Sequence, residues 1–250
     1  MLRKFIYGLC LVALLVIVGG YGYLYTKLPQ RSGEIVLPGL KHKVQVLFDE
    51  WAVPHIEAQN KQDAFLALGY LHAQERLFQL ELMIRVAQGR LSEILGEDML
   101  DADRYFRTLG ISRFAETYAK DYFHKNPQNA KDALKAYLSG LNAFVSGGPA
   151  PIEFTLLGIP KREYTIKDLI CTGVYMSYTF TNAVRQDPLL SYIYNTFGAG
   201  YLKDLAVYWP KDNTKIDVSS ISSGSELALA ELSFEIANVL SQVPPFFGSN

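Results

Sequence analysis

The stretch DAFLALGYLHAQERLFQLELMIRVAQGRLSEILG, residues 63–96, decides the fold of this 250-residue chain. Its apolar side chains recur at helical spacing, so it predicts one long helix that continues to Val86. Asn60 can cap the start of this helix, with Asp63 at its third position favouring the positive end of the helix dipole. Gly89 is expected to break it. The recurring apolar residues are Ala64, Phe65, Leu68, Leu71, Leu77, Leu80 and Ile84.

Upstream of this helix the pattern changes to short extended segments. In residues 35–38 and 44–48, apolar side chains alternate with polar ones or follow one another, and Gly39 lies between the two segments. This pattern predicts two short strands. Residues 49–54 predict a turn, and residues 55–57 resume an extended segment.

Downstream, most of the chain predicts helices. The clearest covers residues 129–146, where one face is apolar and Gly147-Gly148-Pro149 ends the pattern. Residues 151–160 predict a loop with a short apolar core, and residues 219–225 a flexible, low-complexity stretch. The remaining expected helices cover residues 90–95, 103–123, 168–180, 188–197 and 226–240.

The N-terminus carries a separate apolar segment. Arg3 and Lys4 precede residues 5–25, which hold no charged side chain. Such a run is long enough to cross a bilayer as a helix, and it also fits a signal peptide. Either function places the rest of the chain in the periplasm or another extracytoplasmic space. If residues 5–25 are retained, they tether the chain to the inner membrane. A buried core helix is the alternative.

Composition excludes several classes of protein. The chain is 49% hydrophobic and 20% charged, with a net charge of -1, which is a globular composition without a basic surface for nucleic acid. Cys10 lies in the apolar segment and is a poor disulfide partner for Cys171. The four histidines lack the spacing of zinc ligands, so we expect no zinc site.

Five stretches, in order, resemble the penicillin amidase family of N-terminal-nucleophile hydrolases. The first matches a family pattern of an apolar strand, Asp, two residues and Gly-Val-Pro-His-Ile, with Ala52 where glycine is usual. The second is the densest, and the last resembles the junction where the family's precursor is cleaved. The stretches are residues 46–56, 63–96, 137–144, 151–158 and 248–250.

The resemblance implies a fold and a nucleophile. It implies an α+β fold: the mostly helical α-chain part of an αββα N-terminal-nucleophile hydrolase, with short N-terminal strands. Cleavage between Gly248 and Ser249 would make Ser249 the catalytic N-terminal residue. The expected domains are an anchor or signal peptide (1–25), an α-chain region (26–218), a linker (219–248) and the start of the catalytic β-chain (249–250).

The resemblance also carries over a few weaker site residues. Met176 and Phe180 fall where family members place a methionine and a phenylalanine at the acyl pocket, and their spacing puts both on one helix face. Plain core packing is the other interpretation of this pair. The family often binds a structural calcium, for which Asp187 and its neighbour Gln186 are the candidate ligands. No cofactor is required for the chemistry. His55 and His72 are expected to make structural contacts only.

The expected function is hydrolysis of an N-acyl amide through an acyl-enzyme on Ser249. The expected partners are the chain's own β-chain, a small acylated amide and, through residues 5–25, a membrane, but no nucleic acid. Family substrates include β-lactam side-chain amides, N-acyl-homoserine lactones and acylated lipopeptides. The rival hypothesis is a non-catalytic, membrane-tethered helical binding module, which explains the anchor and the helices but not the ordered motifs.

Overall fold

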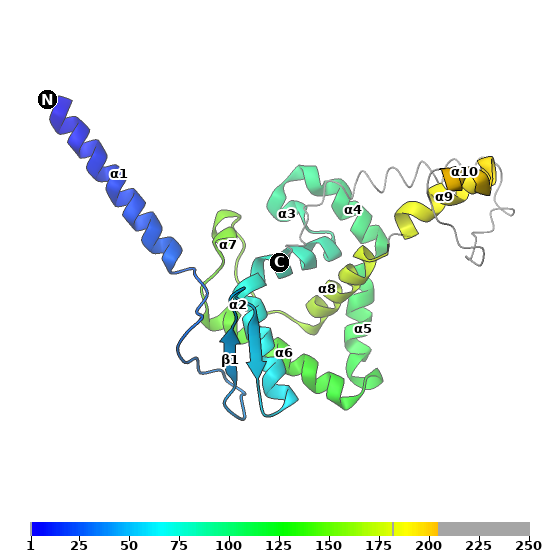
Figure 1. Cartoon of the computed structure of the whole chain (residues 1–250), viewed down its shortest axis with the longest axis horizontal. Helices are drawn as coiled ribbons and strands as arrows, with labels where there is room; N and C mark the ends of the chain where they lie inside the picture. The colour runs from blue at the N-terminus through cyan, green and yellow to red at the C-terminus, as the bar shows by residue number, and fades with distance from the viewer. Residues whose placement is uncertain (1, 182, 205–250) are drawn as a thin grey trace. The chain divides into compact units, whose positions relative to one another are not determined.

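A computed structural model describes residues 2–181 and 183–204 of the chain. The described part is mostly helical and contains one two-stranded sheet, in agreement with the expected composition of elements (Figure 1). The chain divides into two compact units. Among the described residues, 2–84 and 112–171 form the first unit, and 85–111, 172–181 and 183–204 form the second.

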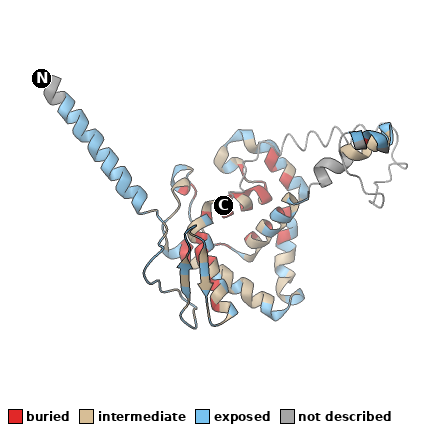
Figure 2. Cartoon of the chain, in the orientation of Figure 1, coloured by how far each residue is buried: buried red, intermediate tan, exposed pale blue. Residues whose placement is uncertain are grey.

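The first helix, α1, spans Leu2–Tyr25 and is exposed along the length for which burial is described (Figure 2). Within it, Ile6–Tyr25 is long and apolar enough to cross a membrane, and none of it is buried against protein. A helix that buries no apolar side chain gains nothing from the protein core. This exposure argues against the alternative of a buried core helix.

The two strands form an antiparallel hairpin, with β1 at Gln45–Phe48 and β2 at Pro54–Glu57. Val46 pairs with Ile56, and Phe48 pairs with Pro54. The expected strand at residues 44–48 is therefore confirmed, but the one at residues 35–38 is wrong. That segment pairs with no other strand in the described residues, because Pro38 lacks an N–H and Val36 is 94% exposed.

A single carboxylate organises the turn between the strands. Oδ1 of Asp49 accepts the N–H groups of Trp51 (2.9 Å) and Val53 (2.8 Å). Ala52 adopts a left-handed conformation with φ of 60°, the only such residue besides glycine among those described. The glycine usual at this position in the family pattern therefore has a physical reason, since only glycine adopts this conformation without cost.

We expect Ala52→Gly to stabilise the protein. Removing Cβ relieves the left-handed strain, which outweighs the added freedom of the unfolded chain by about 0.5–1 kcal/mol. Thermal unfolding should show a melting temperature higher by about 1–4 °C. Ala58→Gly is the matched control, because Ala58 has no positive φ and the change should lower stability. A lower melting temperature for Ala52→Gly would contradict the argument.

The central helix, α2, spans Lys61–Gln88, close to its expected bounds. Asn60 caps it as predicted, because its Oδ1 accepts the N–H of Asp63 (2.8 Å). Asp63 is buried and accepts the backbone N–H groups of Lys41 (2.9 Å) and His42 (3.0 Å). The bond from Lys41 is the main reason that the pKa of Asp63 lies below its ordinary value. Arg76 has non-helical backbone angles and kinks the helix.

Helix α2 meets α6, Gln128–Gly147, at two glycines. A Cβ placed on Gly140 would lie 1.8 Å from the carbonyl oxygen of Leu66, and one on Gly69 would lie 2.0 Å from that of Tyr137. Neither distance is sterically possible, so the two backbones cross at a separation that only glycine permits. Leu141 and Phe144 of α6 are buried beside this crossing.

Two expectations for the remaining helices are wrong. The single helix expected at residues 103–123 is two, α4 at Leu100–Leu109 and α5 at Ile111–Lys125. Gly110 separates them because its φ of 75° ends α4. The loop expected at residues 151–160 contains a short helix, α7, at Ile152–Leu156, which begins after Pro151 and buries Phe154.

Helices α3, α8 and α9 lie near their expected positions, whereas η1 and α10 were not predicted. In the second unit, α3 spans Ser92–Leu95, followed by the 3₁₀ turn η1 at Glu97–Met99 and later by α10 at Ala199–Asp204. Helix α8 spans Ile166–Thr179, and α9, Ala183–Phe197, begins five residues earlier than expected. The helix and flexible stretch expected after residue 204 lie outside the described residues.

The turn after α2 is held by α4 within the second unit. Asp103 is buried, and its carboxylate accepts the N–H groups of Leu91 (2.7 Å) and Ser92 (3.0 Å). Gly89 has a φ of 63°, and its carbonyl accepts Nε of Arg107 (2.7 Å). Gly89 breaks the helix as predicted, and the densest of the motifs is thus the helix α2 followed by a structural turn.

Candidate functional site

The predicted nucleophile and its cleavage partner are beyond the part of the chain that the structure describes. Gly248 and Ser249 lie after residue 204, so their roles stay predictions. The described residues do contain helix α8, which carries the other residues predicted to bind substrate.

Met176 and Phe180 lie on the same face at the end of α8. The N–H of Phe180 donates to the carbonyl of Met176 (3.3 Å), which extends the helical turn by one residue beyond Thr179. Met176 is 37% exposed and Phe180 is 78% exposed. Neither side chain is buried by the described residues, and the role of this pair at an acyl pocket stays a prediction.

Gln186 and Asp187 lie in the first turns of α9. Their side chains are outside the description, and calcium binding through them stays a prediction. Among the residues that the structure describes, no group of three or more His, Cys, Asp or Glu side chains could hold a metal ion.

A buried ionic cluster fixes the first turn of α8 within the first unit. Arg162 binds Asp168 with two hydrogen bonds, from Nη1 (2.9 Å) and Nη2 (3.2 Å). Nη2 also lies 3.2 Å from Oε2 of Glu81, which accepts the hydroxyl of Tyr164 (3.0 Å). The carboxylate of Asp168 caps the helix by accepting the N–H (2.9 Å) and hydroxyl (2.8 Å) of Thr165.

The charges in this cluster depend on one another. Burial by itself would raise the pKa of Asp168, but the bonds and charge of Arg162 outweigh it and hold the pKa below its usual value. Burial and the neighbouring Glu81 together raise the pKa of Tyr164. A paired buried carboxylate becomes costly when its partner is removed. The cluster therefore fixes the start of the helix that carries Met176. The cluster could not be predicted from the sequence, because Glu81 is far from Arg162 along the chain.

His72 and His55 make structural contacts, as expected, and His42 also makes one. Nδ1 of His72 lies 3.0 Å from the hydroxyl of Tyr137, and desolvation lowers the pKa of His72. Nε2 of His55 lies 3.2 Å from Asp49, and Nδ1 of His42 lies 3.3 Å from Asp63. None of these rings is paired with a serine hydroxyl.

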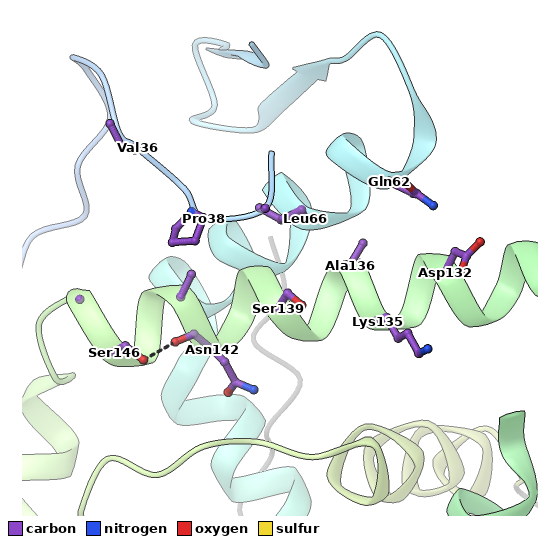
Figure 3. Close-up of a pocket in the computed structure, with 13 residues that line it drawn as sticks. Val36, Pro38, Gln62, Leu66, Asp132, Lys135, Ala136, Ser139, Asn142 and Ser146 are labelled. Carbon is purple, nitrogen blue, oxygen red and sulfur yellow. Dashed lines mark hydrogen bonds between the residues drawn. The ribbon is translucent and has the colours of Figure 1, made fainter. Parts of the chain in front are cut away.

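An open groove of about 960 Å³ runs along α6 (Figure 3). Its polar groups include Ser146, whose hydroxyl donates to the carbonyl of Asn142 (2.9 Å). The side chain of Asn142 bonds the backbone of Tyr164, with its Nδ2 on the carbonyl and its Oδ1 on the N–H, both at 2.9 Å. Asp132 is the one carboxylate lining this groove. These contacts are structural, and the groove holds no nucleophile beside a base.

Comparison with known protein families shows to which family the chain belongs. The model of the family described as "Penicillin amidase" matches residues 43–250, which include the hairpin, α8 and the predicted nucleophile. The chain belongs to the penicillin amidase family. The resemblance carried by the five motifs is thus confirmed.

Relatives within the penicillin amidase family cover the same region. The chain is 46% identical over 142 residues to "Penicillin acylase 2 proenzyme" of Pseudomonas sp. (strain SE83), a match that covers 56% of this chain and 18% of that protein. It is 35% identical over 173 residues to "Acyl-homoserine lactone acylase QuiP" of Pseudomonas putida, covering 69% of this chain and 20% of that protein. The chain thus spans about a fifth of the length of these curated relatives.

A solved structure of the same family resembles the chain distantly. It is a thermostable penicillin G acylase from Alcaligenes faecalis, with a TM-score of 0.49 and 19% identity. The alignment covers 70% of this chain and 96% of that one. The αββα arrangement expected for the complete penicillin amidase fold stays a prediction, since the described residues contain only one small sheet.

Proposed function

We propose that this chain is the α-chain part of an acylase that hydrolyses N-acyl amides through an acyl-enzyme on Ser249. The observation that carries the proposal is the family match over residues 43–250, because it includes Gly248 and Ser249. The name of the relative from Pseudomonas sp. calls that protein a proenzyme, which supports maturation by cleavage here.

Cleavage between Gly248 and Ser249 would create the catalytic base. The Oγ of Ser249 attacks the carbonyl carbon of Gly248, and the peptide nitrogen leaves as it takes up a proton, which forms an ester. Water then hydrolyses the ester and frees the carboxylate of Gly248 and the hydroxyl of Ser249. Gly248 suits this step because it lacks a Cβ and tolerates strained backbone angles.

The freed α-amine of Ser249 then takes the role that histidine has in other serine hydrolases. Its ordinary pKa is about 7.7–8, so a useful fraction is neutral near pH 7. Through a water molecule it accepts the hydroxyl proton as Oγ attacks the amide carbonyl of the substrate. The proton passes to the leaving amine when the C–N bond breaks. Water finally hydrolyses the acyl ester.

The acyl group is apolar in this proposal, because Met176 and Phe180 expose apolar side chains on one face of α8. The relatives' names point to two classes of substrate, penicillins and acyl-homoserine lactones. Calcium bound through Asp187, with the neutral carbonyl of Gln186, would be structural only. The anchoring of α1 in a membrane and an extracytoplasmic location are also part of the proposal.

The β-chain partner would supply the groups that stabilise the tetrahedral oxyanion. Losing one such donor costs about 10²- to 10³-fold in rate. We therefore expect the 250-residue chain alone to hydrolyse no N-acyl amide measurably, and the two-chain enzyme to do so. Mass spectrometry of the enzyme mixed with an activated acyl substrate should find the added acyl group on a chain that begins at Ser249. Turnover by the isolated chain, or an acyl group on another residue, would refute the proposal.

A further inference from the structure

The hairpin of β1 and β2 has an edge without hydrogen-bond partners. The N–H of Asp49 donates across the hairpin to the carbonyl of Val53 (3.2 Å). Backbone groups alternate in direction along an antiparallel strand, so those of Gln45 and Leu47 also face β2. The N–H and C=O groups of Val46 and Phe48 then point outward, and none of them has a partner among the described residues.

The two edges of the hairpin differ in what they offer. The outward positions of β2 are Pro54 and Ile56, and Pro54 has no N–H to donate. The edge of β1 thus has two N–H donors and two carbonyl acceptors. The edge of β2 also has two carbonyl acceptors but only one donor. An added strand gains more hydrogen bonds on β1.

The side chains of the hairpin also leave apolar area uncovered. Leu47 is 48% exposed, Val53 is 50% exposed and Trp51 at the turn is 79% exposed. A two-stranded hairpin of four-residue strands is marginal by itself, and further strands stabilise it. Burying these three side chains under a partner would add the apolar area that the hairpin lacks.

We infer that the edge of β1 receives an extended strand of the acylase β-chain, which continues the sheet through the backbone of Val46 and Phe48. The family match begins at Lys43, directly before β1, so the hairpin belongs to the shared enzyme rather than to the tether. The chain makes up about a fifth of its relatives' length, so most of the enzyme is available to cover this edge. The inference rests on the proposed function for the identity of the partner.

Two proline variants test the inference in the two-chain enzyme. Val46→Pro removes one outward N–H from β1 and leaves the bonds inside the hairpin. It should weaken association of the α- and β-chains about tenfold, as expected for one lost hydrogen bond and a steric clash. Ile56→Pro is the matched control, because Ile56 pairs directly with Val46 and is equally half-buried, but its N–H lies on the other edge. It should change association less than threefold.

Amide hydrogen exchange in the unmodified enzyme gives a second measurement that does not depend on a variant folding. The amides of Val46 and Phe48 should exchange at least about tenfold more slowly than that of Ile56. Equal exchange at the three amides, or an equal loss of association in both variants, would overturn the inference. Hydrolysis at Ser249 without this protection would sink the inference and leave the proposed function standing. Slow exchange at Val46 and Phe48 without hydrolysis at Ser249 would support the inference and refute the proposed function.

Discussion

Ser249→Ala is expected to abolish both maturation and hydrolysis. Alanine has no hydroxyl, so it can neither attack the carbonyl of Gly248 nor form the acyl-enzyme. Removing a nucleophile of this kind lowers the rate by at least about 10³-fold. A coupled measurement of precursor cleavage by electrophoresis and of amide hydrolysis by released amine would check both losses.

Two further variants separate the two functions of Ser249. Ser249→Cys keeps a nucleophile and should retain part of the cleavage, because a thiol can also attack the preceding carbonyl. A β-chain that is expressed already starting at residue 249, with alanine there, bypasses maturation and should still be inactive. Hydrolysis at the normal rate in that enzyme would show that the catalytic hydroxyl lies elsewhere.

Gly140→Ala is expected to destabilise the crossing of α2 and α6 by about 3 kcal/mol, at the upper end of what overpacking costs. The added Cβ would lie 1.8 Å from the oxygen and 2.8 Å from the carbon of the Leu66 carbonyl. Both contacts are with backbone, which no change of side-chain rotamer can relieve, so the helices must separate. Thermal unfolding should show a melting temperature lower by about 6–12 °C.

Gly147→Ala is the matched control for this crossing. It lies on the same helix, and a Cβ there would meet nothing within 4 Å. Alanine favours helix over glycine by up to about 1 kcal/mol, so this variant should be neutral or more stable. Equal stability of Gly140→Ala and Gly147→Ala would mean that the helices do not pack as described.

The sequence predicted the elements whose cause is local. The apolar spacing and the Asn60 cap predicted α2, and Gly89 predicted its end. In the structure Gly89 has a positive φ, which agrees with this break. The break at Gly110 was missed, because the residues on both sides have helical propensity and a helix tolerates an isolated glycine in many cases. Helix α7 was missed because it has only five residues and depends on burying Phe154.

The features that depend on distant residues could not be predicted. Gly69 and Gly140 are each unremarkable within a helix, and their importance arises only where the helices meet. The contact of Arg162 with Glu81 joins residues that are far apart in sequence. For the candidate site, the family resemblance predicts Ser249 as the nucleophile and Met176 and Phe180 as the acyl-pocket pair. The structure adds the exposure of Met176 and Phe180, and Ser249 stays a prediction.

The bonds of Asp63 have a mechanical consequence for a tethered enzyme. Lys41 and His42 lie between α1 and the hairpin, and both backbone N–H groups are held by this one carboxylate at the start of α2. If α1 is anchored as proposed, tension on the chain at α1 would reach the long central helix before it reached β1. Under the proposed anchoring, this carboxylate would take up motion of α1 before it reached the sheet edge that we propose for assembly.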